Sequence, residues 1–144
     1  MKTLPIETYR MIVGSVPIMC VDCVIYKDGK ILLVRRNNQP LKGRYWTPGG
    51  RVLKGEKLVD AVKRKVKEET GLTIKPISVV GFYEDFYKKN ELGLDMVHTT
   101  SIVFAASYVK GKVKLDSQSK GYRWANKLPK DLTLQLMFIN SKSI

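Results

Sequence analysis

Hydrophobic and polar side chains follow helical spacing most clearly in the middle of this chain, at residues 58–69. The apolar residues of this segment recur three or four positions apart, as one buried helix face requires. They are Leu58, Ala61, Val62 and Val66. Gly71 follows, and glycine commonly ends a helix because it adopts the left-handed conformation without strain. The pattern therefore predicts one amphipathic helix over residues 58–69.

Extended segments are predicted on both sides of this helix. Apolar and β-branched residues at 18–26 and 31–34 indicate two strands, and Asp28 and Gly29 favour a hairpin turn between them. Further strands are predicted at residues 46–47, 72–87, 97–108 and 122–124, and weaker helices at residues 4–14 and from residue 128 onward. The 144 residues show no repeat or linker, so we expect a single domain over residues 1–144. The fold class expected is α/β, with a mixed β-sheet sandwiched between helices.

Composition and cysteine usage favour a cytoplasmic protein. The chain is 44% hydrophobic and 27% charged, which is ordinary for a globular domain. Its apolar runs fall short of the ~18 residues that span a bilayer, and no signal peptide is recognisable. Cys20 and Cys23 form an isolated C-x-x-C motif without a second ligand pair for zinc. We therefore expect both to be buried core thiols.

The formal net charge of +13 is high for a chain of this size. Such a charge attracts anionic partners, either nucleic acids or phosphorylated small molecules. The basic residues are spread along the chain, and no basic stripe is interleaved with aromatic residues. We therefore expect an enzyme with a phosphorylated substrate, and neither a nucleic-acid nor a membrane partner.

Candidate metal-binding chemistry is concentrated around the predicted central helix. Arg64 and Glu68 are four positions apart and can form an ion pair on its surface. Glu69 lies about 100° further round the helix, so the two glutamates share one edge. Glu56, in the preceding loop, can add a third carboxylate. Oxygen ligands of this kind suit Mg²⁺.

Gly49 and Gly50 precede this loop, and glycine lets the backbone carbonyl groups approach a metal ion closely. The spacing resembles the Nudix box. In that motif, a glycine and a glutamate are separated by five residues, and seven more precede R-E-U-x-E-E-x-G-U, where U is apolar. Six of its seven fixed polar or glycine positions match, at Gly50, Glu56, Arg64, Glu68, Glu69 and Gly71, and both apolar positions match, at Val66 and Leu72. Six such matches arise by chance about once in 10⁷ starts. The resemblance implies the Nudix fold and a Mg²⁺-dependent hydrolase of nucleoside diphosphates linked to another group.

One position departs from the box, because Lys65 occupies the place of the first glutamate after the arginine. Lys65 is three positions from Glu68 and four from Glu69, so it can form ion pairs with both. We therefore expect fewer bound cations than in a typical member of the family, down to a single Mg²⁺.

Outside the box, the chain resembles the GDP-mannose mannosyl hydrolase branch of the family over roughly residues 10–126. The similar segments are residues 15–17, 21–22, 38–40, 46, 48–52, 82–87, 118 and 121–124. The resemblance implies hydrolysis at the anomeric carbon of a nucleoside diphosphate sugar, with Mg²⁺ stabilising the leaving diphosphate. The implied metal ligands are Glu69, Gln118 and a carbonyl of Gly49 or Gly50, with Glu68 as a further candidate.

The same resemblance assigns substrate contacts to several side chains. Arg36 and Arg51 would bind the diphosphate, since arginine pairs bidentately with phosphate oxygens. Asp22 would contact the sugar or hold an arginine. Arg51 and Arg64 are also candidate catalytic residues.

The catalytic base is open. The branch has a histidine directly after the glutamine, and this chain has Ser119 there. His98, the only histidine, is one candidate for the base. Glu84 and Asp85 are others, if partial burial raises the pKa of one of them.

The expected function is Mg²⁺-dependent hydrolysis of a nucleoside diphosphate sugar such as GDP-mannose, either to GDP and sugar or by cleavage of the diphosphate. Attack at phosphorus would use Glu68 or Glu56 as base. The alternatives are ADP-ribose, dinucleotide or nucleoside triphosphate substrates, and a non-catalytic module that binds a nucleotide or RNA. Family analogy also suggests a homodimer.

Overall fold

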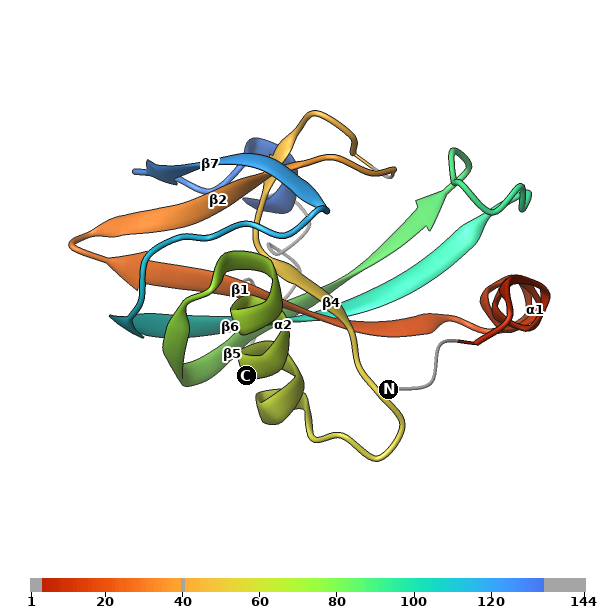
Figure 1. The fold of residues 1–144 in the computed structure, drawn as a ribbon, viewed down its shortest axis with the longest axis horizontal. Helices are drawn as coiled ribbons and strands as arrows, with labels where there is room; N and C mark the ends of the chain where they lie inside the picture. Colours follow the sequence, from red (N-terminus) through yellow and green to blue (C-terminus); the bar gives the residue numbers. More distant parts are fainter. Residues whose placement is uncertain (1–3, 40, 134–144) are drawn as a thin grey trace, which may run out of the picture.

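The computed structural model describes residues 4–39 and 41–133 of the chain. Its helices and strands follow one another in the order shown in Figure 1. They are α1 (Ile6–Ser15), β1 (Ile18–Lys27), β2 (Lys30–Arg36), β3 (Tyr45–Trp46), β4 (Gly49–Arg51), α2 (Leu58–Thr70), β5 (Thr73–Tyr87), β6 (Val97–Lys110) and β7 (Ser119–Ala125). Within this part of the chain, no helix is long and apolar enough to cross a membrane.

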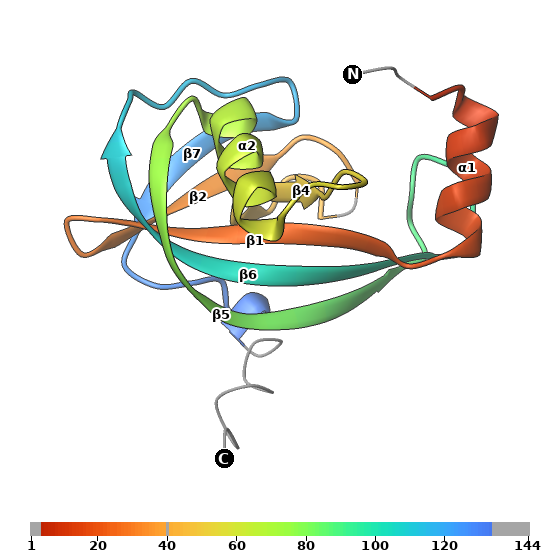
Figure 2. The same cartoon turned by 90° about the horizontal axis from the view of Figure 1, so that it is seen from below.

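The sheet is mixed, as the sequence predicts. Its strand order is β3-β2-β1-β6-β5, with β4 paired to β1 and β7 paired to β2. β1 and β6 run parallel, whereas the other pairs are antiparallel. Figure 2 shows α2 lying across one face of the sheet, and a short blue helical turn on the opposite face. α1 lies at one end, away from the β1–β2 hairpin.

Each face of the sheet carries its own hydrophobic core. The predicted apolar stripe of α2 packs on one face, where Ala61, Val62 and Val66 are fully buried against β1, β5 and β6. The second core lies on the other face, where Leu132 from the C-terminal turn is fully buried. Helical segments thus cover both faces, and the site below forms where β1, β4 and α2 meet.

The predicted elements match observed ones closely, but the short strand β4 was not predicted, and one of the cysteine predictions is wrong. α2 ends one residue later than expected, and Gly71 closes it with a φ of +73°. Helical structure in the C-terminal region begins at Lys130, and the rest of that predicted helix lies outside the described residues. Cys23 is buried as predicted, but Cys20 is only partly buried, because it lines a cavity rather than the core.

Candidate active site

The site begins where β1 exchanges one partner strand for another. Its C-terminal end pairs with β2, whereas Asp22 pairs with Gly49 of the short strand β4. A side chain at Gly49 would overlap the Asp22 carboxylate and the Val21 carbonyl, so only glycine allows this close approach. β4 then leads directly into the loop before α2. The pairing therefore brings the start of β1 beside the helix that carries the box motif.

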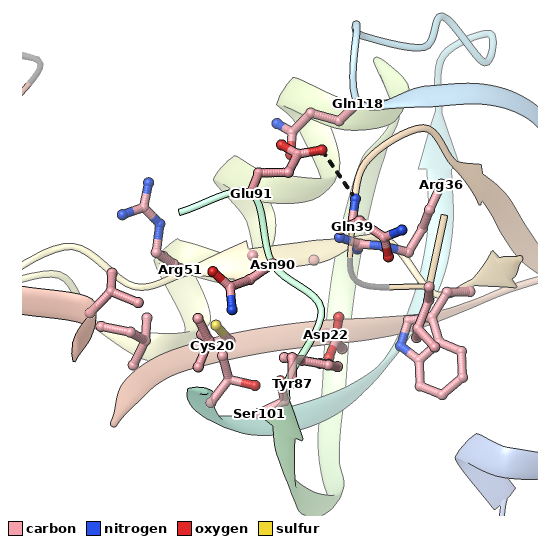
Figure 3. A pocket seen from close by; sticks show the side chains of 18 of the residues that line it. Cys20, Asp22, Arg36, Gln39, Arg51, Tyr87, Asn90, Glu91, Ser101 and Gln118 are labelled. Carbon is pink, nitrogen blue, oxygen red and sulfur yellow. Dashed lines mark hydrogen bonds between the residues drawn. The ribbon is translucent and has the colours of Figure 1, made fainter. Parts of the chain in front are cut away.

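A cavity of ≈ 370 Å³ opens at this junction. It is lined by seven of the residues predicted for the site, namely Asp22, Arg36, Gly49, Gly50, Arg51, Glu69 and Gln118. Figure 3 shows Arg36 and Arg51 on opposite sides of this cavity, with Asp22 between them. Residues far apart in the sequence therefore converge on one polar space with two arginines and two buried carboxyl groups.

His98 is not among the residues that line the cavity. Its neighbours Val97 and Thr99 line it, and side chains alternate faces along a strand, so His98 points to the other side of β6. Its Nε2 atom lies 3.3 Å from Glu84 Oε1, and its ring stacks on Phe86. The structure therefore does not bring His98 together with Glu69 and Gln118.

Arg64 also lies outside the cavity lining, where it ties the loop before α2 to the helix. Its guanidinium donates hydrogen bonds of 2.7 and 2.8 Å to the two oxygens of Glu56, and of 3.3 and 3.2 Å to the two oxygens of Glu68. It also donates to the Arg51 carbonyl at 3.0 Å. The predicted ion pair with Glu68 is thus confirmed, and the same arginine fixes the backbone of β4.

Glu56 does not line the cavity, and both of its oxygens accept hydrogen bonds from Arg64. One of its oxygens also accepts a hydrogen bond from the Leu53 N–H. The hydrogen bonds from Arg64 hold the pKa of Glu56 down at about 2, although burial opposes them. Among the residues that the structure describes, no three His, Cys, Asp or Glu side chains form a group that could hold a metal ion.

Glu69 is the buried carboxylate of the site. The Gly49 N–H donates to its Oε2 at 3.1 Å, and Lys65 Nζ lies 3.8 Å from its Oε1. Burial raises the pKa of Glu69 to about 7, against the opposing effects of Lys65 and the Gly49 N–H. Lys65 Nζ also lies 3.2 Å from Glu68, which is half-exposed. Both ion pairs expected for Lys65 are therefore present.

Asp22 belongs to a hydrogen-bonded group that sequence reasoning did not find. The Tyr83 hydroxyl donates to Asp22, and the Trp46 indole N–H donates to the Tyr83 hydroxyl at 3.2 Å. Burial raises the pKa of Asp22 to about 6, whereas hydrogen bonds with Tyr83 and Ser101 lower it. A sequence signal did exist, because a buried Tyr or Trp needs a partner for its polar atom. The identity of that partner depended on strand pairing.

Two other parts of the cavity wall were also missed. Tyr9, from α1, stacks beneath the Arg51 guanidinium at 4.5 Å and holds it at the cavity edge. The loop between β5 and β6 contributes Glu91, whose carboxylate accepts a hydrogen bond from the Gln39 N–H at 3.4 Å. Figure 3 shows this bond between Glu91 and Gln39, two residues of the cavity lining. Neither contact has a sequence signal, since both join distant segments.

The donor set fits one Mg²⁺ whose remaining ligands are water or the phosphates of a bound ligand, and it does not fit a metal ion held by protein side chains alone. Mg²⁺ typically binds one or two carboxylates together with substrate phosphates and water. Glu69 offers one carboxylate at the cavity. The amide nitrogen of Gln118 donates to Asp116 at 3.3 Å, which leaves the amide oxygen as a metal donor.

Comparison with known proteins shows the family of the chain. A family model described as the NUDIX domain matches residues 17–128. The chain is 38% identical over 131 residues to the ADP-ribose pyrophosphatase of Methanocaldococcus jannaschii, covering 90% of this chain and 73% of that protein. It is 34% identical over 116 residues to the low-salt glycan biosynthesis protein Agl8 of Haloferax volcanii, covering 80% and 74%. The crystal structure of the MutT protein from Methanosarcina mazei superposes with a TM-score of 0.70 at 29% identity, covering 89% of this chain and 99% of that one.

The chain therefore belongs to the Nudix family. It is a Nudix hydrolase, and hydrolases of this family generally use a divalent metal ion, typically Mg²⁺. Their substrates contain nucleotides.

Proposed function

We propose that this protein is a Mg²⁺-dependent pyrophosphatase that acts on a nucleoside diphosphate joined to a sugar, such as ADP-ribose or GDP-mannose. The observation that carries the proposal is the cavity that joins Arg36 and Arg51 to Glu69. Two arginines can neutralise the charge of a diphosphate, and a buried carboxylate beside them can bind a metal ion. A volume of ≈ 370 Å³ is within the range of small-molecule sites.

The two arginines would hold the diphosphate from opposite sides. A guanidinium donates two parallel hydrogen bonds to phosphate oxygens, which fixes both position and orientation. Arg51 is well suited to this role, because Tyr9 supports its side chain and Arg64 holds its carbonyl group. Asp22 would accept a hydrogen bond from a sugar hydroxyl, since its carboxyl group lines the same cavity.

A bound Mg²⁺ would neutralise the diphosphate and favour departure of the leaving phosphate. The residues that would hold it are Glu69, Gln118 and a carbonyl group of Gly49 or Gly50. Glu68 is the carboxylate that we assign to receive the proton of the attacking water, because it shares the helix edge with Glu69 and is open to solvent. The water oxygen would attack one phosphorus, and the bridging P–O bond would break, giving two monophosphates.

Attack at phosphorus is preferred over attack at the anomeric carbon for two reasons. Ser119 replaces the base histidine of the branch that attacks carbon, and His98 faces away from the cavity. In addition, the chain is 38% identical to a relative named as an ADP-ribose pyrophosphatase. The relative named for glycan biosynthesis supports keeping nucleotide sugars within the substrate class.

The test is hydrolysis of ADP-ribose and of GDP-mannose, in parallel, in ¹⁸O-labelled water with Mg²⁺, with products read by mass spectrometry. We expect ¹⁸O in one of the two monophosphates. Label in free mannose with unlabelled GDP would overturn attack at phosphorus. Turnover of neither compound would overturn the substrate class. Glu69→Gln is the matched control, and we expect it to lose at least 100-fold in turnover while keeping the wild-type circular dichroism spectrum.

A further inference from the structure

One cation of the site is supplied by the protein itself. Lys65 is buried in the middle of α2, with its Nζ atom 3.2 Å from Glu68 and 3.8 Å from Glu69. Lysine is rarely buried unless it is paired, and here both partners are carboxylates, of which Glu69 lines the cavity and Glu68 is half-exposed outside its lining. Lys65 itself lines the cavity.

The surrounding backbone holds this ammonium group in place. A side chain at Gly50 would overlap Lys65 Cε and come within 3.1 Å of its Nζ, so the end of the lysine lies directly against β4. Gly50 has a φ of +153°, which other residues rarely adopt. The lysine is therefore confined between the helix and the strand.

We propose that the Lys65 ammonium is a fixed cation of the active site, which takes the place of a second divalent ion between Glu68 and Glu69 and contacts the bound diphosphate. The contact with the diphosphate rests on the proposed function, whereas the metal count does not. The physical basis is charge balance. Arg64 shares its single positive charge between Glu56 and Glu68, so two of the three negative charges of Glu56, Glu68 and Glu69 remain to be balanced by other cations. One ammonium and one Mg²⁺ shared with substrate suffice for them, and a second Mg²⁺ would be repelled by the ammonium.

The test is the number of Mn²⁺ ions bound by the intact, substrate-free protein, measured from the electron paramagnetic resonance signal of free Mn²⁺. We expect wild type to saturate at one ion per chain. Lys65→Glu places a third carboxylate three and four positions from Glu68 and Glu69, and should raise the count to about two. Lys63→Glu is the matched control, because it changes the net charge equally on the exposed face of α2 and should leave one ion bound.

Lys65→Gln separates the two parts of the proposal. It removes the ammonium without adding a carboxylate, so the Mn²⁺ count should stay at one, while the KM for the hydrolysed nucleotide should rise about 10-fold or more. Thermal unfolding identifies any variant that fails to fold. If Lys65→Glu fails to fold, the Mn²⁺ count of wild type and the KM of Lys65→Gln still test the proposal. Two ions on wild type, or equal counts for Lys65→Glu and Lys63→Glu, would overturn the fixed cation. An unchanged KM in Lys65→Gln would overturn the diphosphate contact. Failure of wild type to hydrolyse either nucleotide sugar, with the expected ion counts, would overturn the proposed function alone.

Discussion

Glu69 combines two properties that are rarely found together on a helix surface. It lies at the rim of a polar cavity, and it is nevertheless almost completely buried, with 6% of its surface exposed. Burial raises its pKa to about 7, and the nearby Lys65 and Gly49 N–H oppose the shift. In the metal-free protein, the carboxyl group therefore titrates near neutral pH. Burial therefore makes the charged carboxylate unfavourable in the metal-free protein, and this favours the binding of a cation beside it.

The buried carboxyl group predicts a pH-dependent stability difference between wild type and Glu69→Gln. Because the folded-state pKa exceeds the ordinary value of 4.5, the group contributes stability fully below pH 4.5, and this contribution is lost as pH rises to about 7. Between these limits, the unfolding free energy of wild type should fall relative to that of the variant, by up to about 3 kcal/mol. Urea titrations of both proteins with EDTA at several pH values would measure this difference in unfolding free energy. Parallel pH profiles would contradict the prediction, and Glu7→Gln, on an exposed position of α1, is the control.

At the scale of elements, α2 depends on its C-terminal end for its direction. Gly71 closes the helix with a φ of +73°, and its N–H donates to the Lys67 carbonyl. Lys67 Nζ in turn donates to the Gly71 carbonyl at 2.8 Å. The chain then turns directly into β5. The end of the helix thus fixes how α2 lies on the sheet, and with it the position of Glu69.

Gly71→Ala should destabilise the protein by about 1–2 kcal/mol, because a Cβ atom is strained at this positive φ. It would also lie 3.3 Å from the Lys112 carbonyl oxygen, which adds crowding. Gly29→Ala is the control, since Gly29 has a φ of +74° but open space around the added atom. Chemical denaturation should show a larger loss for Gly71→Ala than for Gly29→Ala. Equal losses would mean that crowding at Lys112 contributes nothing.

At the scale of the whole molecule, the net charge of +13 acts at longer range than any single contact. A strongly basic protein attracts an anionic substrate and speeds its association. The arginines of the cavity then bind the anionic substrate that the overall charge has attracted. Basicity of this kind suits a diphosphate substrate without requiring a nucleic-acid partner.

Ionic strength should therefore affect association more than turnover. Raising NaCl from 50 to 200 mM should lower kcat/KM several-fold and change kcat little, because salt screens long-range attraction. Steady-state kinetics with the hydrolysed nucleotide would measure both. A constant kcat/KM would contradict electrostatic attraction. Binding of single-stranded RNA that weakens steeply over the same range, without nucleotide turnover, would instead favour a nucleic-acid-binding module.

The sequence by itself determined the local part of this protein. The helix of residues 58–69, its closing glycine and the ion pairs of Arg64 and Lys65 with Glu68 could be predicted, because positions three or four apart on a helix are always neighbours. The other strands followed from apolar runs, but β4 did not, because its sequence is Gly-Gly-Arg and the glycines indicated the end of a strand. The box spacing identified Glu69 and the glycines before the helix.

Tertiary structure alone decided which distant groups meet. The engagement of Glu56 by Arg64, the Tyr83–Asp22 hydrogen bond and the Tyr9–Arg51 contact all join separate elements. The register of β6 decided that His98 faces away from the cavity, since a shift of one residue would turn every side chain of the strand to the opposite face. Spacing along one helix is a local property, whereas contacts between strands and helices depend on how the whole chain packs. The sequence therefore determined the acidic helix edge, and packing determined what surrounds it.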